Sequence, residues 1–287
     1  MNKTKALSIF IYRIIPKSLI SRIFGHIVLI PLPQSLMDSI IRWYSAKYNV
    51  KDEYHIPPGG FRNFDDFFTR IINKETHPID PSDNCAISPV DARIDQYGEI
   101  REAAIIQAKG LDYSIRELIP SDTYIKFIWG KFITLYLSPG DYHRIHAPVG
   151  GSVIGYFNIP GKLFTVQDWL VKSFPGLFVK NERIVSYIAS NAGTVAVCKI
   201  GAFNVGKITL SYCGVWANRT FRRRHEIFFD QGARVPVRTG DELGVFHLGS
   251  TVILLFQKDA ITFDDFKVGD KIRMGERIGT LKNLKKK

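Results

Sequence analysis

The chain has 287 residues, of which 45% are hydrophobic and 23% charged, so it can bury a sizeable core in one or two domains. Its three scattered cysteines argue against a disulfide framework and a cysteine-based zinc site, and they predict packing residues in a reducing compartment: Cys85, Cys198 and Cys213. The net charge of +12 favours an anionic partner, either nucleic acid or an acidic membrane surface.

The first 50 residues combine positive charge with helical periodicity. They carry seven Lys and Arg residues against one acid, Asp38. The apolar spacing predicts one helix from Ile9 to Pro16 and an amphipathic helix with Leu19, Ile23 and Ile27 on one side. A third helix is predicted to start with a capping box at Ser35 and Asp38, and its stripe contains Leu36, Ile40 and Tyr44.

This combination favours a membrane surface over nucleic acid, although packing of both stripes against the protein core is the alternative. The best uncharged run, residues 24–37, contains two prolines and is shorter than a spanning helix requires. We therefore expect residues 1–50 to associate peripherally with an anionic membrane.

After this segment the sequence changes character. Residues 57–60 are Pro-Pro-Gly-Gly and predict a linker, and Asn63 is placed to cap a short helix. Later apolar runs separated by Gly, Pro and Asp predict strands at 132–137, 194–200, 207–212 and 251–256, with helical periodicity confined to 113–119 and 164–171. The prediction is an α+β fold in which a β-rich, mostly antiparallel catalytic body, residues 51–287, follows the short amphipathic helices.

Two histidines lie three residues apart in the Asp-Tyr-His-Arg-Ile-His run at 141–146, directly after a Ser-Pro-Gly turn. His143 and His146 have the chemistry of metal ligands or of an acid–base pair, and such a spacing also occurs in ordinary loops. A third metal ligand at a recognisable spacing is not evident. The residues alone leave these alternatives open.

An aspartate and a serine elsewhere could join a histidine in catalysis. Asp91 ends the turn formed by residues 88–90, and a carboxylate can fix the tautomer of a histidine. Ser250 follows Gly249 at the start of a predicted strand. An activated serine hydroxyl can attack the preceding carbonyl, and glycine at that position leaves the approach open.

The order of these elements is similar to that of the phosphatidylserine decarboxylases. The Leu-Gly-Ser-Thr element at 248–251, with its approach at 239–246, resembles their self-processing site, and Asp91 and the 141–146 run precede it in the same order. Further similar segments are 67–70, 108–110, 160–164 and 181–183. The resemblance covers roughly residues 60–280.

The resemblance implies a processing triad in which His146 takes the proton of Ser250 and Asp91 orients His146. The Ser250 oxygen attacks the carbonyl of Gly249, and the chain divides into fragments 1–249 and 250–287 that remain associated. Ser250 becomes a covalent pyruvoyl group, the Schiff-base centre for the substrate amine, so neither pyridoxal phosphate nor a metal is expected. His143 is expected to assist the decarboxylation step.

The implied reaction converts phosphatidylserine to phosphatidylethanolamine and carbon dioxide, at the cytoplasmic face of a bacterial inner membrane. The implied partners are membrane phosphatidylserine and an anionic membrane surface but no nucleic acid, and a homo-oligomer is left open. Two alternatives differ in class: a metal-dependent hydrolase that uses His143 and His146, and a non-catalytic membrane-surface binding module.

Overall fold

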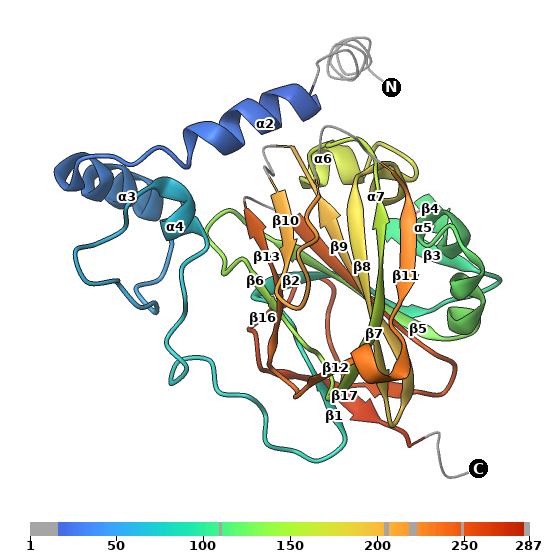
Figure 1. The fold of residues 1–287 in the computed structure, drawn as a ribbon. Coiled ribbons are helices and arrows are strands. Elements are labelled where there is room, and N and C mark those ends of the chain that lie inside the picture. The colour runs from blue at the N-terminus through green and yellow to red at the C-terminus, as the bar shows by residue number, and fades with distance from the viewer. Residues whose placement is uncertain (1–16, 109–110, 204–206, 218–222, 248–249, 284–287) are drawn as a thin grey trace.

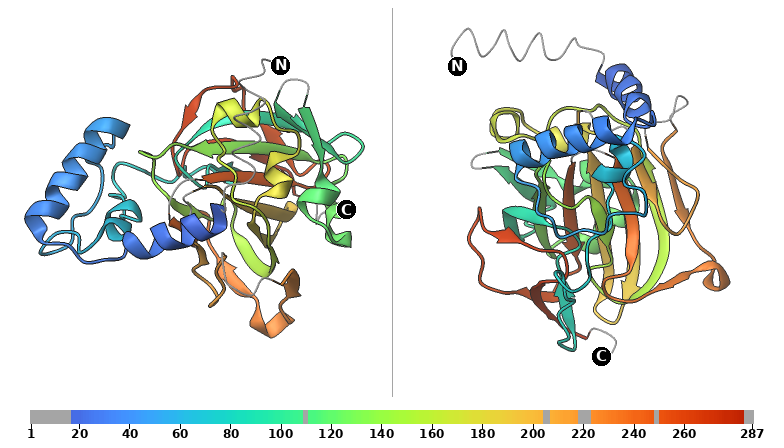
Figure 2. Two further views of the ribbon diagram at one scale, coloured as in Figure 1. Left: turned by 90° about the horizontal axis from the view of Figure 1, so that it is seen from above. Right: turned by 90° about the vertical axis from the view of Figure 1, so that its left-hand side faces the viewer.

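The computed structural model describes residues 17–283 except 109–110, 204–206, 218–222 and 248–249. The helix expected from Ile9 to Pro16 lies outside the described residues. Three N-terminal helices lie on one side of a larger β-rich body (Figures 1 and 2). The predicted α+β class, with a mostly antiparallel β-rich body, is confirmed.

The N-terminal helices are α2 (Lys17–Ile27), α3 (Gln34–Tyr48) and α4 (Phe64–Phe68). We call residues 17–70 the helical unit. Its members share a hydrophobic cluster that is separate from the main core and contains Val28, Met37, Tyr44, Val50, Phe61, Phe67 and Phe68. Aromatic edge-to-face contacts dominate this cluster, and the Tyr44 ring lies 5.0 Å from the Phe64 ring and 6.0 Å from the Phe67 ring.

The sequence predictions for these helices met different outcomes. Asn63 caps α4 as expected, because its side-chain oxygen accepts a hydrogen bond from the Asp66 amide at 2.9 Å. The capping box at Ser35 is wrong: α3 begins at Gln34 after Pro33, without a side-chain cap. Placing Tyr44 on a lipid-facing stripe is also wrong, since Tyr44 is 8% exposed and packs among the aromatic rings.

The first predicted stripe does face outward. Leu19, Ile23 and Ile27 on α2 are each about half exposed, at 52%, 52% and 53%. The exposed apolar surface continues through Leu29, Ile30 and Leu36. Within the described residues, no helix is both long enough and apolar enough to cross a bilayer.

The β-body is built around a nine-stranded sheet in which all paired strands are antiparallel. Its strands run in the order β11 (His225–Phe228), β7 (Gly151–Ile159), β8 (Arg183–Ser190), β9 (Gly193–Gly201), β14 (Ser250–Phe256), β5 (Lys131–Leu137), β2 (Ala92–Glu99) and β16 (Lys271–Ile272), and β12 (Val235–Val237) also pairs with β7.

Smaller sheets and short helices complete the body. One sheet contains β10 (Lys207–Leu210), β13 (Glu242–His247) and β6 (Arg144–His146), another contains β1 (Cys85–Ile87), β17 (Arg277–Leu281) and β15 (Ile261–Phe263), and β3 (Ala104–Ala108) pairs with β4 (Leu111–Ser114). The helices are α5 (Ile115–Leu118), α6 (Asp168–Val171), α7 (Leu177–Lys180) and the 3₁₀ turns η1 (Asp122–Phe127) and η2 (Gln231–Ala233).

All four predicted strands are present as β5, β9, β10 and β14. Strand β14 lies between β9 and β5, and residues 251–256 are completely buried, which explains their uninterrupted apolar character. The predicted helix at 113–119 is shortened because β4 extends to Ser114, and the one at 164–171 begins only at Asp168. Helix α7 was not predicted, since four residues are too few to show periodicity.

Candidate active site

The histidine run lies in the connection between two sheets. Strand β5 ends at Leu137, a tight turn follows, and β6 begins at Arg144. Asp141 closes this turn: its carboxylate accepts the Ser138 amide at 2.6 Å, and its own amide donates to the Ser138 carbonyl at 3.0 Å. The turn places His143 directly before the small sheet of β6, β10 and β13, and His146 is the last residue of β6.

His143 is completely buried. Its Nδ1 lies 2.8 Å from the carbonyl oxygen of Asp141, so Nδ1 carries the proton and Nε2 has a free lone pair. Nε2 has no hydrogen-bond partner among the described residues, and the Phe68 ring packs 4.1 Å from the imidazole. Burial, with help from the Arg70 charge, lowers the pKa of His143 to about 3. This histidine is therefore neutral, with an unprotonated Nε2 that is shielded from solvent.

His146 has the same tautomer with different partners. Its Nδ1 donates to the carbonyl oxygen of Gly240 at 2.8 Å, and its Nε2 accepts from the Tyr142 hydroxyl at 3.0 Å. Burial lowers the pKa of His146 from its ordinary value. Its amide donates to the Pro89 carbonyl at 2.9 Å, which brings the histidine run beside the segment that ends at Asp91.

Asp91 contacts a histidine that the sequence analysis did not select. Its carboxylate lies 3.1 Å from Nε2 of His77 and accepts the Met274 amide at 2.8 Å. In this conformation Asp91 makes no hydrogen bond to His146. His77 gave no signal in the sequence, because a single histidine before a proline has no pattern that distinguishes it from a loop residue.

Ser250 is the first residue of β14, and its backbone lies opposite Leu137 on β5 and Gly201 on β9. The Ser250 side chain and Gly249 lie outside the described residues. The preceding strand, β13, pairs with β6, and the amide of Phe246 donates to the His143 carbonyl at 2.9 Å. Strand β13 therefore lies beside His146 at its start, at Glu242, and beside His143 near its end, at Phe246, four residues before Ser250.

The helical unit holds the turn before β6 in place. The Tyr44 hydroxyl donates to the Pro139 carbonyl at 2.9 Å, and Arg70 Nη2 donates to the carbonyls of Gly140 at 2.8 Å and Asp141 at 3.1 Å. Arg144 Nε donates to the Thr69 carbonyl at 2.8 Å. The unit therefore supports the turn that carries both histidines, a function that its amphipathic sequence did not reveal.

A second tie reaches the segment that precedes the proposed cleavage site. Asp65 on α4 pairs with Nδ1 of His247 at 2.8 Å, and His247 ends β13, three residues before Ser250. Nε2 of the same ring lies 3.2 Å from the Thr209 hydroxyl.

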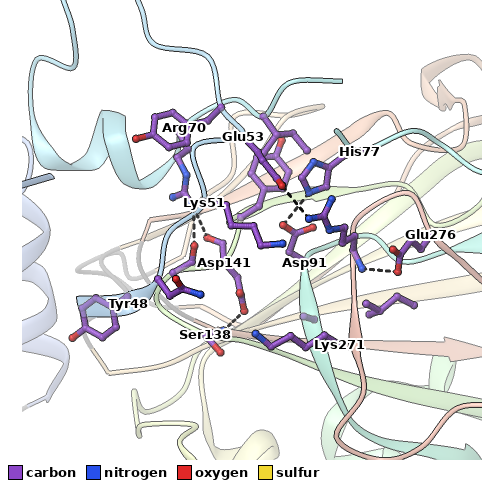
Figure 3. A pocket seen from close by; sticks show the side chains of 18 residues that line it. Tyr48, Lys51, Glu53, Arg70, His77, Asp91, Ser138, Asp141, Lys271 and Glu276 are labelled. Atoms are coloured by element: carbon purple, nitrogen blue, oxygen red, sulfur yellow. Dashed lines mark hydrogen bonds and ion pairs between the residues drawn. The ribbon is translucent and has the colours of Figure 1, made fainter. Parts of the chain in front are cut away.

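A pocket of about 360 Å³ opens between the helical unit and the β-body (Figure 3). Ser138, Asp141, Tyr142 and Asp91 line one part of it. The pocket is adjacent to the strand that carries Ser250, because Ser138 directly follows Leu137. Among the described residues, no group of three or more His, Cys, Asp or Glu side chains is placed to hold a metal ion.

Comparison with known proteins gives consistent similarities. The family model for phosphatidylserine decarboxylase matches residues 64–280. A phosphatidylserine decarboxylase proenzyme from Myxococcus xanthus is 38% identical over 94% of this chain and 96% of its own length. Proenzymes of the same name from Vibrio cholerae and Idiomarina loihiensis are 38% and 34% identical over 91% and 98% of this chain, and over 94% and 99% of their own lengths.

Proposed function

The chain belongs to the phosphatidylserine decarboxylase family, and we propose that it matures by cleavage before Ser250 and decarboxylates membrane phosphatidylserine to phosphatidylethanolamine. The observation that carries the proposal is the position of Ser250 at the start of β14, opposite Leu137, from which a tight turn leads to the buried His143 and the partly buried His146. Neither alternative function, the metal-dependent hydrolase or the non-catalytic membrane module, has support from the similar proteins.

The two histidines are suited to proton transfer in a buried site. In both, a backbone carbonyl holds the Nδ1 proton, so Nε2 is the basic nitrogen. We assign the processing base to His146, with Asp91 as its supporting carboxylate, and proton transfer during decarboxylation to His143. The assignment requires two changes of hydrogen bond. Nε2 of His146 would have to accept from the Ser250 hydroxyl instead of the Tyr142 hydroxyl, and the Asp91 carboxylate would have to leave His77 and contact His146.

The pyruvoyl group formed from Ser250 would supply the electron sink that decarboxylation needs. The surroundings fit such a group, because Nε2 of His143 is completely buried beside the end of β13 and has no partner among the residues that the structure describes. His143 would hold or deliver a proton there, and the Phe68 ring would exclude water from its imidazole. The fragments would remain associated because β14 is hydrogen-bonded to strands of the larger fragment on both sides.

The exposed apolar face of α2 supports a peripheral contact with the membrane. An apolar surface of this kind on a basic helix is typical of proteins that lie at the lipid boundary. Arg42 and Lys47 on α3 are exposed near this surface and would face anionic headgroups.

The test combines fragment analysis with a reaction assay. Purified wild-type protein should give fragments 1–249 and 250–287 under denaturing conditions, with the mass of a pyruvoyl group on the smaller one, and should release carbon dioxide from phosphatidylserine. Ser250→Ala should remain one chain and release none. Cleavage of the alanine variant at the same position would contradict the role of Ser250, and a cleaved wild-type protein without decarboxylase activity would contradict the proposed reaction.

A further inference from the structure

In the pocket between the helical unit and the β-body, the carboxylates have more hydrogen-bond and ion-pair partners within the protein than most of the cations have. Each of its four carboxylates accepts a donor. Glu53 pairs with Arg273 at 3.0 Å, and Glu276 accepts the Arg273 amide at 2.9 Å. Asp91 and Asp141 are held by the donors already described. The acceptors of the pocket are thus engaged by the protein itself.

The cations of the pocket differ in this respect. Arg273 is already paired with Glu53, whereas Arg70, Lys51 and Lys271 form no ion pair with a described carboxylate. Arg70 is only 5% exposed, and while Nη2 donates to two carbonyls, Nη1 has no hydrogen-bond partner in the described part of the chain. Its guanidinium lies against the rings of Tyr54 and Phe67, each 5.4 Å away, and makes no ion pair with a described carboxylate. Burial lowers the pKa of Arg70, which reflects the cost of keeping this charge away from water.

Two lysines extend into the same pocket. Lys51 comes from the helical unit and Lys271 from β16 (Figure 3). Both are exposed, and neither forms a hydrogen bond or ion pair with another described residue. Three cations without a direct ion pair among the described residues therefore line this pocket, and Asp141 and Asp91 act on Arg70 only as more distant charges, as Asp141 does on Lys271.

We propose that this pocket binds a phosphate group, the phosphodiester of the lipid headgroup, with Arg70 as the fixed donor and Lys51 and Lys271 as flanking charges. The inference rests on the proposed function, whose substrate has this group. Arginine is the side chain best suited to phosphate oxygens, and a charge-assisted hydrogen bond would satisfy Nη1.

The position of the pocket suits this substrate. Only two carbon atoms and an ester oxygen separate the amine of a phosphatidylserine headgroup from its phosphorus. Ser138, which lines the pocket, directly follows the residue paired with Ser250, so an amine at position 250 would leave the phosphodiester within or beside the pocket.

The test uses processed enzyme and phosphatidylserine in neutral detergent micelles, where electrostatic attraction to a membrane does not limit the rate. The double variant Lys51→Gln/Lys271→Gln should raise the KM for phosphatidylserine about tenfold or more, because it removes two charge-assisted contacts, and should change kcat much less. The matched control is Lys258→Gln/Lys282→Gln, which removes the same charge from two exposed lysines outside the pocket.

Inorganic phosphate distinguishes the source of the anion. The proposal is supported if phosphate competes with phosphatidylserine in the wild type, and if the Lys51/Lys271 variant shows both weaker competition by phosphate and a raised KM for the lipid. An unchanged KM overturns the lipid assignment, even where phosphate still competes, because the site would then serve free phosphate. Arg70→Lys should also weaken phosphate competition, and its extent of self-cleavage checks that the turn at 138–141 is intact. A wild-type enzyme without decarboxylase activity would instead refute the proposed function itself.

Discussion

The hydrogen bond between Asp65 and His247 predicts that the helical unit controls self-cleavage. His247 is the last residue of β13, so the pair fixes one end of the short segment that leads to Ser250. Removing the carboxylate in Asp65→Ala leaves Nδ1 of His247 without its acceptor. We expect the His247 ring to lose its defined position and cleavage to slow, while the nine-stranded sheet keeps its contacts.

The magnitude follows from burial. The Asp65 side chain is 8% exposed and that of His247 is 22% exposed, so solvent screens the pair only in part. A hydrogen bond to a charged group contributes about 1.5–3 kcal/mol when it is shielded. With partial screening we expect about 1.5 kcal/mol, and since each 1.4 kcal/mol corresponds to about tenfold in rate, cleavage should slow by roughly an order of magnitude.

The assay is a time course of cleavage after cell-free synthesis, quenched in denaturant and resolved by size. Asp65→Ala, His247→Ala and the double variant form a double-mutant cycle, in which a direct interaction appears as non-additive effects on the rate. Asp66→Ala is the control, because Asp66 is an exposed aspartate on the same helix with the same charge. If Asp65→Ala is cleaved as fast as Asp66→Ala, the pair has no role in processing and this reasoning is refuted.

Three further predictions address other parts of the molecule. His146→Ala should block cleavage, whereas His143→Ala should permit substantial cleavage and give poor decarboxylation; equal loss of cleavage in both would show that the division of roles is wrong. Full-length protein should sediment with anionic vesicles, and high salt should release it only in part, because salt screens the charges but leaves the apolar contacts intact. Detergent should release it more fully. A chain that begins at Lys51 should bind poorly, and equal binding by this shorter chain would place the membrane contact elsewhere. Burial lowers the pKa of Lys199 from 10.5 to about 7. Between these two pH values the unfolded chain binds a proton that the folded chain does not. The free energy of unfolding should therefore rise with pH across this interval. Lys199→Met should therefore raise the melting temperature more at pH 7 than at pH 10, and an equal gain at both would contradict the assignment.

Local sequence patterns were sufficient for the strands and for the order of the chemical groups. A strand that is buried on both faces needs apolar side chains throughout, so the run at 251–256 was sufficient to predict one. The Asn63 cap involves an amide only three residues away in the chain. The resemblance to a family likewise rested on short motifs in a fixed order. These features depend on neighbours in the chain, so they can be predicted without knowing which distant segments meet.

The tertiary structure decided which side of α3 is buried and which groups surround the histidines. Tyr44 is buried among the aromatic rings of the helical unit, its hydroxyl reaches Pro139, 95 residues away, and Asp65 meets His247 across 182 residues. His77 became a candidate for function only once its contact with Asp91 was known, and Arg70 only once its Nη1 was found without a partner among the described residues. No periodicity or spacing predicts such pairs, since their energies come from burial and hydrogen-bond geometry that exist only after the helical unit has packed against the β-body.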